Sequence, residues 1–97
     1  MATLRMFGPY SWVQPPGENG LLPGEGMAWA MDFGLFFDVA SVAAHPSPHN
    51  SVQALAIENL STAYARTGPP AVNFIVRNVS TTGVRGYRIF VSVMTLS

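Results

Sequence analysis

The segment MAWAMDFGLFFDV, residues 27–39, carries a large apolar residue at every odd position. The even positions hold mostly small or acidic residues, including Asp32 and Asp38. Because side chains alternate between the two sides of a β-strand, this run predicts an extended chain whose odd side is buried. Thirteen residues at about 3.3 Å each would span roughly 40 Å, which is too long for one straight strand in a small domain. Gly34 is the expected break, either as a bulge or as a corner where the chain changes sheet.

Further strands are expected on both sides of this segment, each bounded by turn-forming residues. They cover residues 1–14, 52–60, 71–79 and 84–95. The first is expected to be an edge strand bent at Gly8-Pro9, and residues 80–83 are expected to close a hairpin between the last two, with a bulge at Gly86. The expected core-facing side chains of the last two strands are Val72, Phe74, Val76, Tyr87, Ile89, Val91 and Val93.

This spacing of strands predicts a single all-β domain over residues 1–97. The expected architecture is an antiparallel immunoglobulin-like β-sandwich of about six to seven strands. An open barrel is the second possibility. A helix over residues 35–44 is the main local alternative, since Ala, Leu and Phe tolerate either state.

Two segments near the C-terminus carry a resemblance to a known family. The run VNFIVRNVSTT (72–82) followed by GYRIFVSV (86–93) is similar to the C-terminal hairpin of bacterial immunoglobulin-like domains related to cell adhesion. The turn LPGE (22–25) resembles the proline–glycine–acid turn of such modules. The resemblance implies a structural or adhesive role, and it supplies no catalytic residues.

Few ionised groups are available to cover this domain. Charged residues make up 10% of the chain, as five arginines, five acids and no lysine, against roughly 25% in typical soluble domains. A small domain with a weakly charged surface and no net charge tends to associate. The absence of a concentrated basic face argues against a nucleic acid partner. The chain lacks cysteine, which excludes disulfides and thiolate metal sites and leaves the compartment unknown.

The charges are unevenly distributed along the chain. Four acids precede residue 39, and four of the five arginines follow residue 65. Two faces or ends of opposite sign could therefore meet head to tail between subunits, whereas the alternative is neutralisation between neighbouring strands of one molecule. The longest apolar stretch carries Asp32 and Asp38, which argues against a membrane span, and the N-terminus has no sustained apolar region of a secretory signal.

Two groups of residues are candidates for binding. The expected interface residues are Phe36, Ile75, Phe90, Met94, Ala28 and Ala30, because they lie opposite the assigned core positions of their strands. Tyr10 and Trp12 share one side of the first strand and are candidates for stacking on a sugar ring, with capping of the core as the alternative. We also expect β-edge pairing along residues 3–13 or 87–95.

No enzyme motif or cofactor motif is found in the chain. A loop could bring His45 and His49 to one ion with Asp38 or Asn50 as a third ligand, but two imidazoles alone make an incomplete site, so no metal site is predicted. Asp32 and Asp38 are too far apart along one strand for a glycosidase pair unless Gly34 folds the chain back. The sequence therefore predicts a non-enzymatic module without a cofactor that forms a homo-oligomer or binds a protein through charge-poor sheet faces. The alternative is a small carbohydrate-binding module that uses Tyr10 and Trp12.

Overall fold

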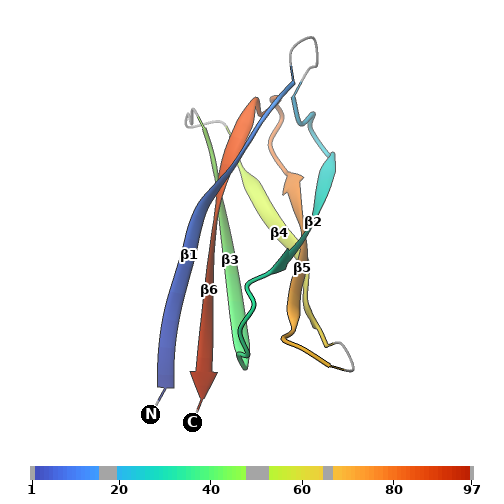
Figure 1. Cartoon of the computed structure of the whole chain (residues 1–97). Coiled ribbons are helices and arrows are strands. Elements are labelled where there is room, and N and C mark those ends of the chain that lie inside the picture. Colours follow the sequence, from blue (N-terminus) through green and yellow to red (C-terminus); the bar gives the residue numbers. More distant parts are fainter. Residues whose placement is uncertain (1, 16–19, 48–52, 65–66, 97) are drawn as a thin grey trace.

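The computed structural model describes residues 2–15, 20–47, 53–64 and 67–96 (Figure 1). Within these ranges the chain forms six strands, which make two three-stranded antiparallel sheets with the orders β1-β6-β3 and β2-β5-β4. The strands are β1 (Ala2–Val13), β2 (Gly26–Asp32), β3 (Val39–Pro46), β4 (Leu55–Ala63), β5 (Ala71–Asn78) and β6 (Gly86–Leu96). The predicted all-β class is confirmed. The helical alternative over residues 35–44 is wrong, because this segment forms a connection and most of β3.

The core lies between the two sheets and is built mainly by alternate residues of the central strands. The inward residues predicted for β5 and β6 are all buried, which confirms the alternation assigned to these strands. Leu21, Phe37 and Val84 complete the buried cluster, and Trp29 of β2 packs against it. Each sheet therefore has one side turned to the core and one side turned outward.

The long apolar segment changes sheet near Gly34, as predicted. It supplies most of β2 to one sheet and ends at Val39, where β3 of the other sheet begins. Gly34 has a φ of 68°, and its backbone N–H donates a 2.9 Å hydrogen bond to Oδ1 of Asp32. The corner also changes the phase of the alternation, so Val39, which was expected in the core, is 48% exposed.

The expected hairpin between the last two strands is wrong. β5 and β6 are the central strands of opposite sheets, and the chain crosses the end of the sandwich between them (Figure 1). The buried Asn78 amide nitrogen donates 2.8 Å hydrogen bonds to the carbonyl oxygens of Leu21 and Thr82, and its side-chain oxygen accepts from the Ser80 N–H. These bonds turn the chain toward the second sheet instead of back along the first.

Gly86 does not form the expected bulge, since it pairs in regular register with Val13. Its role is close approach: a Cβ atom at this position would lie 2.7 Å from the Trp12 carbonyl oxygen and 3.0 Å from that of Ser47. Glycine is required here because two neighbouring backbones leave no space for a side chain.

β1 is an edge strand, as predicted, with a register shift between Phe7 and Tyr10. β6 is hydrogen-bonded on both sides, by β1 and by β3. Edge pairing along residues 87–95 is therefore excluded, and only the part of the prediction that concerns β1 remains open. Ala2 pairs with Leu96, so the first residue of β1 and the last residue of β6 lie at the same end of this sheet (Figure 1).

Candidate functional site

The outward side of the β1-β6-β3 sheet is rich in large apolar residues. Directly paired residues share one side of a sheet, so the pairs of Leu4 and Val39 with Met94 place all three on this side. Leu4 is 58% exposed and Val39 is 48% exposed. We call this surface the apolar face, defined by Leu4, Met6, Val39, Phe90, Met94 and Leu96.

The middle and far end of the apolar face carry its polar groups. The hydroxyls of Ser41 and Ser92 share a 2.6 Å hydrogen bond between β3 and β6. His45 pairs with Arg88 at the far end, and its ring meets the Phe90 ring edge-on at 5.7 Å between centroids. The His45 ring covers part of the Phe90 ring. Phe90 is therefore partly buried although it lies on the outward side of the sheet.

Phe36 lies in the connection between β2 and β3, beside the C-terminal end of β6. Its carbonyl oxygen accepts a hydrogen bond from Thr95 Oγ1, and the next acid, Asp38, accepts a 2.7 Å hydrogen bond from the Leu96 N–H. The Phe36 side chain itself is 68% exposed, whereas that of Phe37 is buried. The connection is thus tied to β6 by the Phe36 carbonyl and the Asp38 carboxylate, and it leaves one aromatic ring in solvent.

The outward side of the β2-β5-β4 sheet has a different surface. Small residues of β2 lie beside β5, with Ala28 opposite Ile75 and Ala30 opposite Asn73. β4 contains a bulge after Glu58, in which Asn59 has a φ of 54°. These features leave an open hollow of about 380 Å³. We call this surface the hollow face, and the hollow is lined on this side by Ala28, Ala30, Asn59, Asn73 and Ile75.

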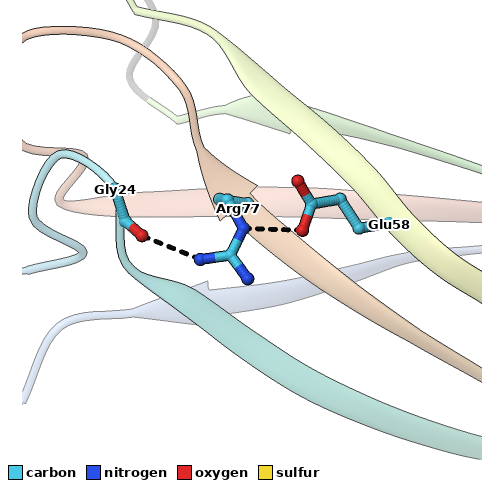
Figure 2. Close-up of polar contacts among 3 residues, drawn as sticks. All are labelled: Gly24, Glu58 and Arg77. Atoms are coloured by element: carbon cyan, nitrogen blue, oxygen red, sulfur yellow. Dashed lines mark hydrogen bonds and ion pairs between the residues drawn. The ribbon is translucent and has the colours of Figure 1, made fainter.

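Arg77 of β5 links β4 to the turn that precedes β2 at one end of the hollow face. Its Nε donates to Glu58 Oε1 at 2.6 Å, and its Nη1 donates to the Gly24 carbonyl oxygen at 2.8 Å (Figure 2). Both charged side chains are more than one-third exposed, so the ion pair contributes little to stability. Its effect on the surface is to neutralise both charges within the hollow face.

The predicted interface residues do not form one surface. Phe90 and Met94 lie on the apolar face, with Phe36 beside it, whereas Ile75 lies on the opposite sheet. Ala28 and Ala30 belong with Ile75 on the hollow face. The grouping of Phe36 with Ala28 and Ala30 is wrong because the corner at residues 33–38 moves the chain from one sheet to the other. None of the six is sealed in the core.

Four residues of the apolar face were not assigned to the interface from the sequence: Leu4, Met6, Val39 and Leu96. The alternation of Leu4 and Met6 with polar neighbours marks one side of a strand, but it does not say which side is covered. Val39 continues the odd positions of the long segment, so only the phase change at the corner identifies it as outward.

Tyr10 and Trp12 are half-buried and turn toward the core. The Tyr10 ring lies 6.4 Å from Phe33, and the Trp12 ring lies 5.3 Å from Tyr87, between centroids. Phe7 stacks on Phe33 at 4.4 Å. These rings fill the side of the sandwich between β1 and β2, which agrees with capping of the core as their role.

Tyr87 is the fully buried phenol of the core. Its hydroxyl accepts a 2.8 Å hydrogen bond from Trp29 Nε1 and donates to Met27 Sδ at 2.8 Å. Burial raises the pKa of the Tyr87 phenol, and the hydrogen bond from Trp29 partly opposes this rise. These contacts hold Trp29 and Met27 of β2 against the opposite sheet.

In the part of the chain that the structure describes, no group of three or more histidines and acids could hold a metal ion. His49 and Asn50, which were considered together with His45 and Asp38, lie outside the described residues. No helix in the described ranges is long and apolar enough to cross a membrane.

Comparison with known proteins finds no matching family model, no matching curated protein and no matching solved structure.

Proposed function

We propose that this chain is a non-catalytic β-sandwich module that works by contact and buries its apolar face against a second copy or another protein. The observation that carries the proposal is the set of exposed large side chains on one sheet: Leu4, Met6, Val39 and Leu96 are each 48% to 71% exposed. Soluble monomers rarely leave a contiguous apolar patch of this kind uncovered.

The energetics favour association through this surface. Apolar area removed from water contributes about 25 cal/mol per Å². Two rows of paired residues cross this face without a charged residue: Leu4, Met94 and Val39, and then Met6, Ser92 and Ser41. Arg88 and His45 lie at the far end, where a polar rim is expected around an apolar centre. The cost of desolvating charged groups is therefore small.

The finer classification of the sandwich is also a proposal. An immunoglobulin-like domain is supported by two antiparallel sheets that enclose one core and by Arg77-Asn78 at the end of β5, followed by a polar turn. The winding differs from the constant-type immunoglobulin arrangement, in which several consecutive strands are neighbours in one sheet. Here only β4 and β5 are consecutive neighbours among the described strands, and the other connections cross between sheets, as in jelly rolls.

Carbohydrate binding by Tyr10 and Trp12 is the alternative, and it has weaker support. Stacking on a sugar requires an aromatic ring face that is open to solvent. Both rings are half-buried against Phe33 and Tyr87. Binding would use only their outer edges.

The test is the mass of the protein in solution, measured by light scattering over a dilution series. We expect oligomers that dissociate on dilution. The Met6→Asp variant should shift dissociation to at least tenfold higher concentration, because Met6 is 71% exposed on the apolar face and a carboxylate there would have to be desolvated.

Thr67→Asp adds the same charge at an exposed position outside both faces and is the matched control. It should leave the mass unchanged. A parent chain that is monomeric at every concentration would contradict self-association. Retention of the parent's mass by Met6→Asp would contradict the use of the apolar face.

A further inference from the structure

The apolar face has basic residues at one end of its sheet and an acid at the other. Arg88 and His45 are exposed register partners at the end where β6 begins and β3 ends. Asp38 is exposed at the opposite end, where its Oδ2 accepts the Leu96 N–H. We propose that the apolar face is covered by the same face of a second copy, turned end for end about a two-fold axis. This inference rests on the proposed function and names its partner and geometry.

The other charged residues that the structure describes do not alter this polarity. Arg5 is in register with the buried Val93, so it belongs to the inward side of β1, where its guanidinium lies 5.8 Å from the centre of the Phe7 ring. Arg85 directly precedes β6, at the end of the sheet that carries Arg88. The remaining ones belong to the other sheet or to the turn before β2: Glu25, Asp32, Glu58 and Arg77.

The register of the sheet fixes the position of the axis. One row of directly paired residues crosses the three strands: Met6, Ser92 and Ser41. An axis along this row reverses the strands of the second copy, so positions equally far before and after the row meet. Arg88 is four residues before Ser92, and Leu96 is four residues after it. Arg88 of each copy therefore comes to the end of the other copy that carries Asp38.

The same axis places apolar groups against one another. Phe90 is two residues before Ser92 and Met94 is two residues after it, so each aromatic ring meets a thioether, which is a favourable contact. On β3, Val39 lies in the row of Met94 and Ala43 in the row of Phe90, so a large side chain meets a small one. The two serine hydroxyls at the axis are already hydrogen-bonded to each other at 2.6 Å, which lowers the cost of burying them.

Other arrangements of two apolar faces fit the charges less well. A two-fold axis along the strands would keep them parallel and bring the Arg88 ends of both copies together, which is unfavourable between like charges. An axis along the row of Phe90 would place Arg88 over Ser92, and an axis along the row of Met94 would place it beyond the end of the sheet. The row of Ser92 is the one that joins opposite charges, so the face is its own complement, as a two-fold contact requires.

The size of the face predicts a weak dimer. Three strands about 4.8 Å apart, with eleven residues of about 3.3 Å each in β6, give a plane of roughly 14 by 36 Å, or about 500 Å² before side-chain relief. Standard interfaces bury roughly 800 Å² on each partner, and weak ones bury less than about 600 Å². The dimer should therefore dissociate on dilution. Assembly stops at two copies because a two-fold contact uses the same surface on both.

Opposite charges at Met6 test the arrangement, because the axis brings Met6 of each copy against Met6 of the other. Met6 is 71% exposed, so Met6→Asp and Met6→Lys should both fold. In light scattering, each variant alone should dissociate at a concentration at least tenfold above that of the parent chain, since like charges meet. Their equimolar mixture should form dimers at concentrations where either variant alone is monomeric, and native mass spectrometry should find one copy of each in those dimers.

Matched controls use the same charges outside the apolar face. Thr67 is exposed in the connection between β4 and β5, so Thr67→Asp and Thr67→Lys should each dimerise alone as the parent does. Their mixture should gain no dimer over either variant alone. Tryptophan fluorescence should match the parent in every variant. If a Met6 variant has lost the parent's fluorescence, Met6→Glu and Met6→Arg replace the pair, with the same expected result.

The outcomes separate this inference from the proposed function. If both Met6 variants dissociate more easily than the parent and their mixture does too, the apolar face is buried against a different surface, and the inference is overturned while the proposed function stands. Parent assemblies larger than a dimer overturn the inference in the same way. If both Met6 variants keep the parent's mass, the inference and the use of the apolar face both fail. A parent chain that is monomeric at every concentration overturns the inference and leaves only burial against another protein.

Discussion

Tyr87 shows how one residue connects the two sheets. It belongs to β6, yet its hydroxyl is bonded to Trp29 and Met27 of β2 in the opposite sheet. The Trp12 ring covers one side of the phenol at 5.3 Å between centroids. A phenolate in this position would lose its hydration and gain only the Trp29 donor, so folding favours the protonated form.

The position of Tyr87 predicts a loss of stability at alkaline pH. Its pKa in the folded chain is raised above the ordinary value of 10.0. Between the pKa of Tyr87 in the unfolded chain and its raised pKa in the folded chain, the unfolded chain binds fewer protons. The free energy of unfolding therefore falls as the pH rises above about 10. Below that range the contribution of Tyr87 is constant. Urea unfolding from pH 7 to 11 measures this dependence.

Tyr87→Phe should lose this part of the alkaline dependence and should unfold about 1–2 kcal/mol more easily at pH 7, since the Trp29 indole loses its acceptor. Tyr64→Phe replaces an exposed tyrosine and is the control, which should keep the parent's stability and pH profile. An unchanged alkaline slope in Tyr87→Phe would contradict the assignment.

At the scale of elements, the contact between β1 and β6 depends on Gly86. Its N-terminal position in β6 lets the backbones of Trp12 and Ser47 approach from both sides. Gly26 is likewise the first residue of its strand, β2. The nearest atoms to a Cβ there would be side-chain atoms of Ile75 and Arg77. Side chains can move aside, whereas paired backbones cannot.

Gly86→Ala should therefore lower the free energy of unfolding by about 1–3 kcal/mol, as overpacking against a fixed backbone does. Gly26→Ala is the matched control and should cost clearly less. Denaturant unfolding of the two variants measures the difference. Equal losses would show that the close approach at Gly86 is relieved by movement of the strands.

The elements were more predictable from the sequence than their pairing. Alternation identified the inward sides of β5 and β6, and the excessive length of the segment at 27–39 indicated a corner at Gly34. The connection at 79–85 was misread because a polar turn between two alternating strands fits a hairpin and a crossing between sheets equally well. The bonds of Asn78 decide between them, and they involve Leu21, which is distant in sequence.

At the scale of the whole molecule, the candidate interface was predicted only in part. Low charge correctly indicates apolar outward positions such as Met94, but assigning residues to a common surface requires the sheet order. Ile75 and Phe90 belong to strands that follow each other in the sequence, and each points away from the core positions of its own strand. They end on opposite sides of the sandwich, since β5 and β6 belong to different sheets.

The proposed assembly should respond to the kind of salt more than to its ionic strength. Sulfate strengthens apolar burial because it is excluded from protein surfaces, whereas screening affects only the few charges of these faces. The mass-average size should therefore rise in sodium sulfate and change little in sodium chloride of equal ionic strength, as measured by light scattering. A large loss of size in sodium chloride would indicate that charge pairs dominate the contact.

The central place of β6 has a consequence for folding during synthesis. Both β1 and β3 have β6 as their hydrogen-bonded neighbour, and both precede it in the chain. Neither strand can pair with this neighbour until β6 has left the ribosome, whereas β2, β4 and β5 can form their own sheet earlier. The apolar residues of β1 and β3 therefore remain accessible to chaperones until β6 emerges.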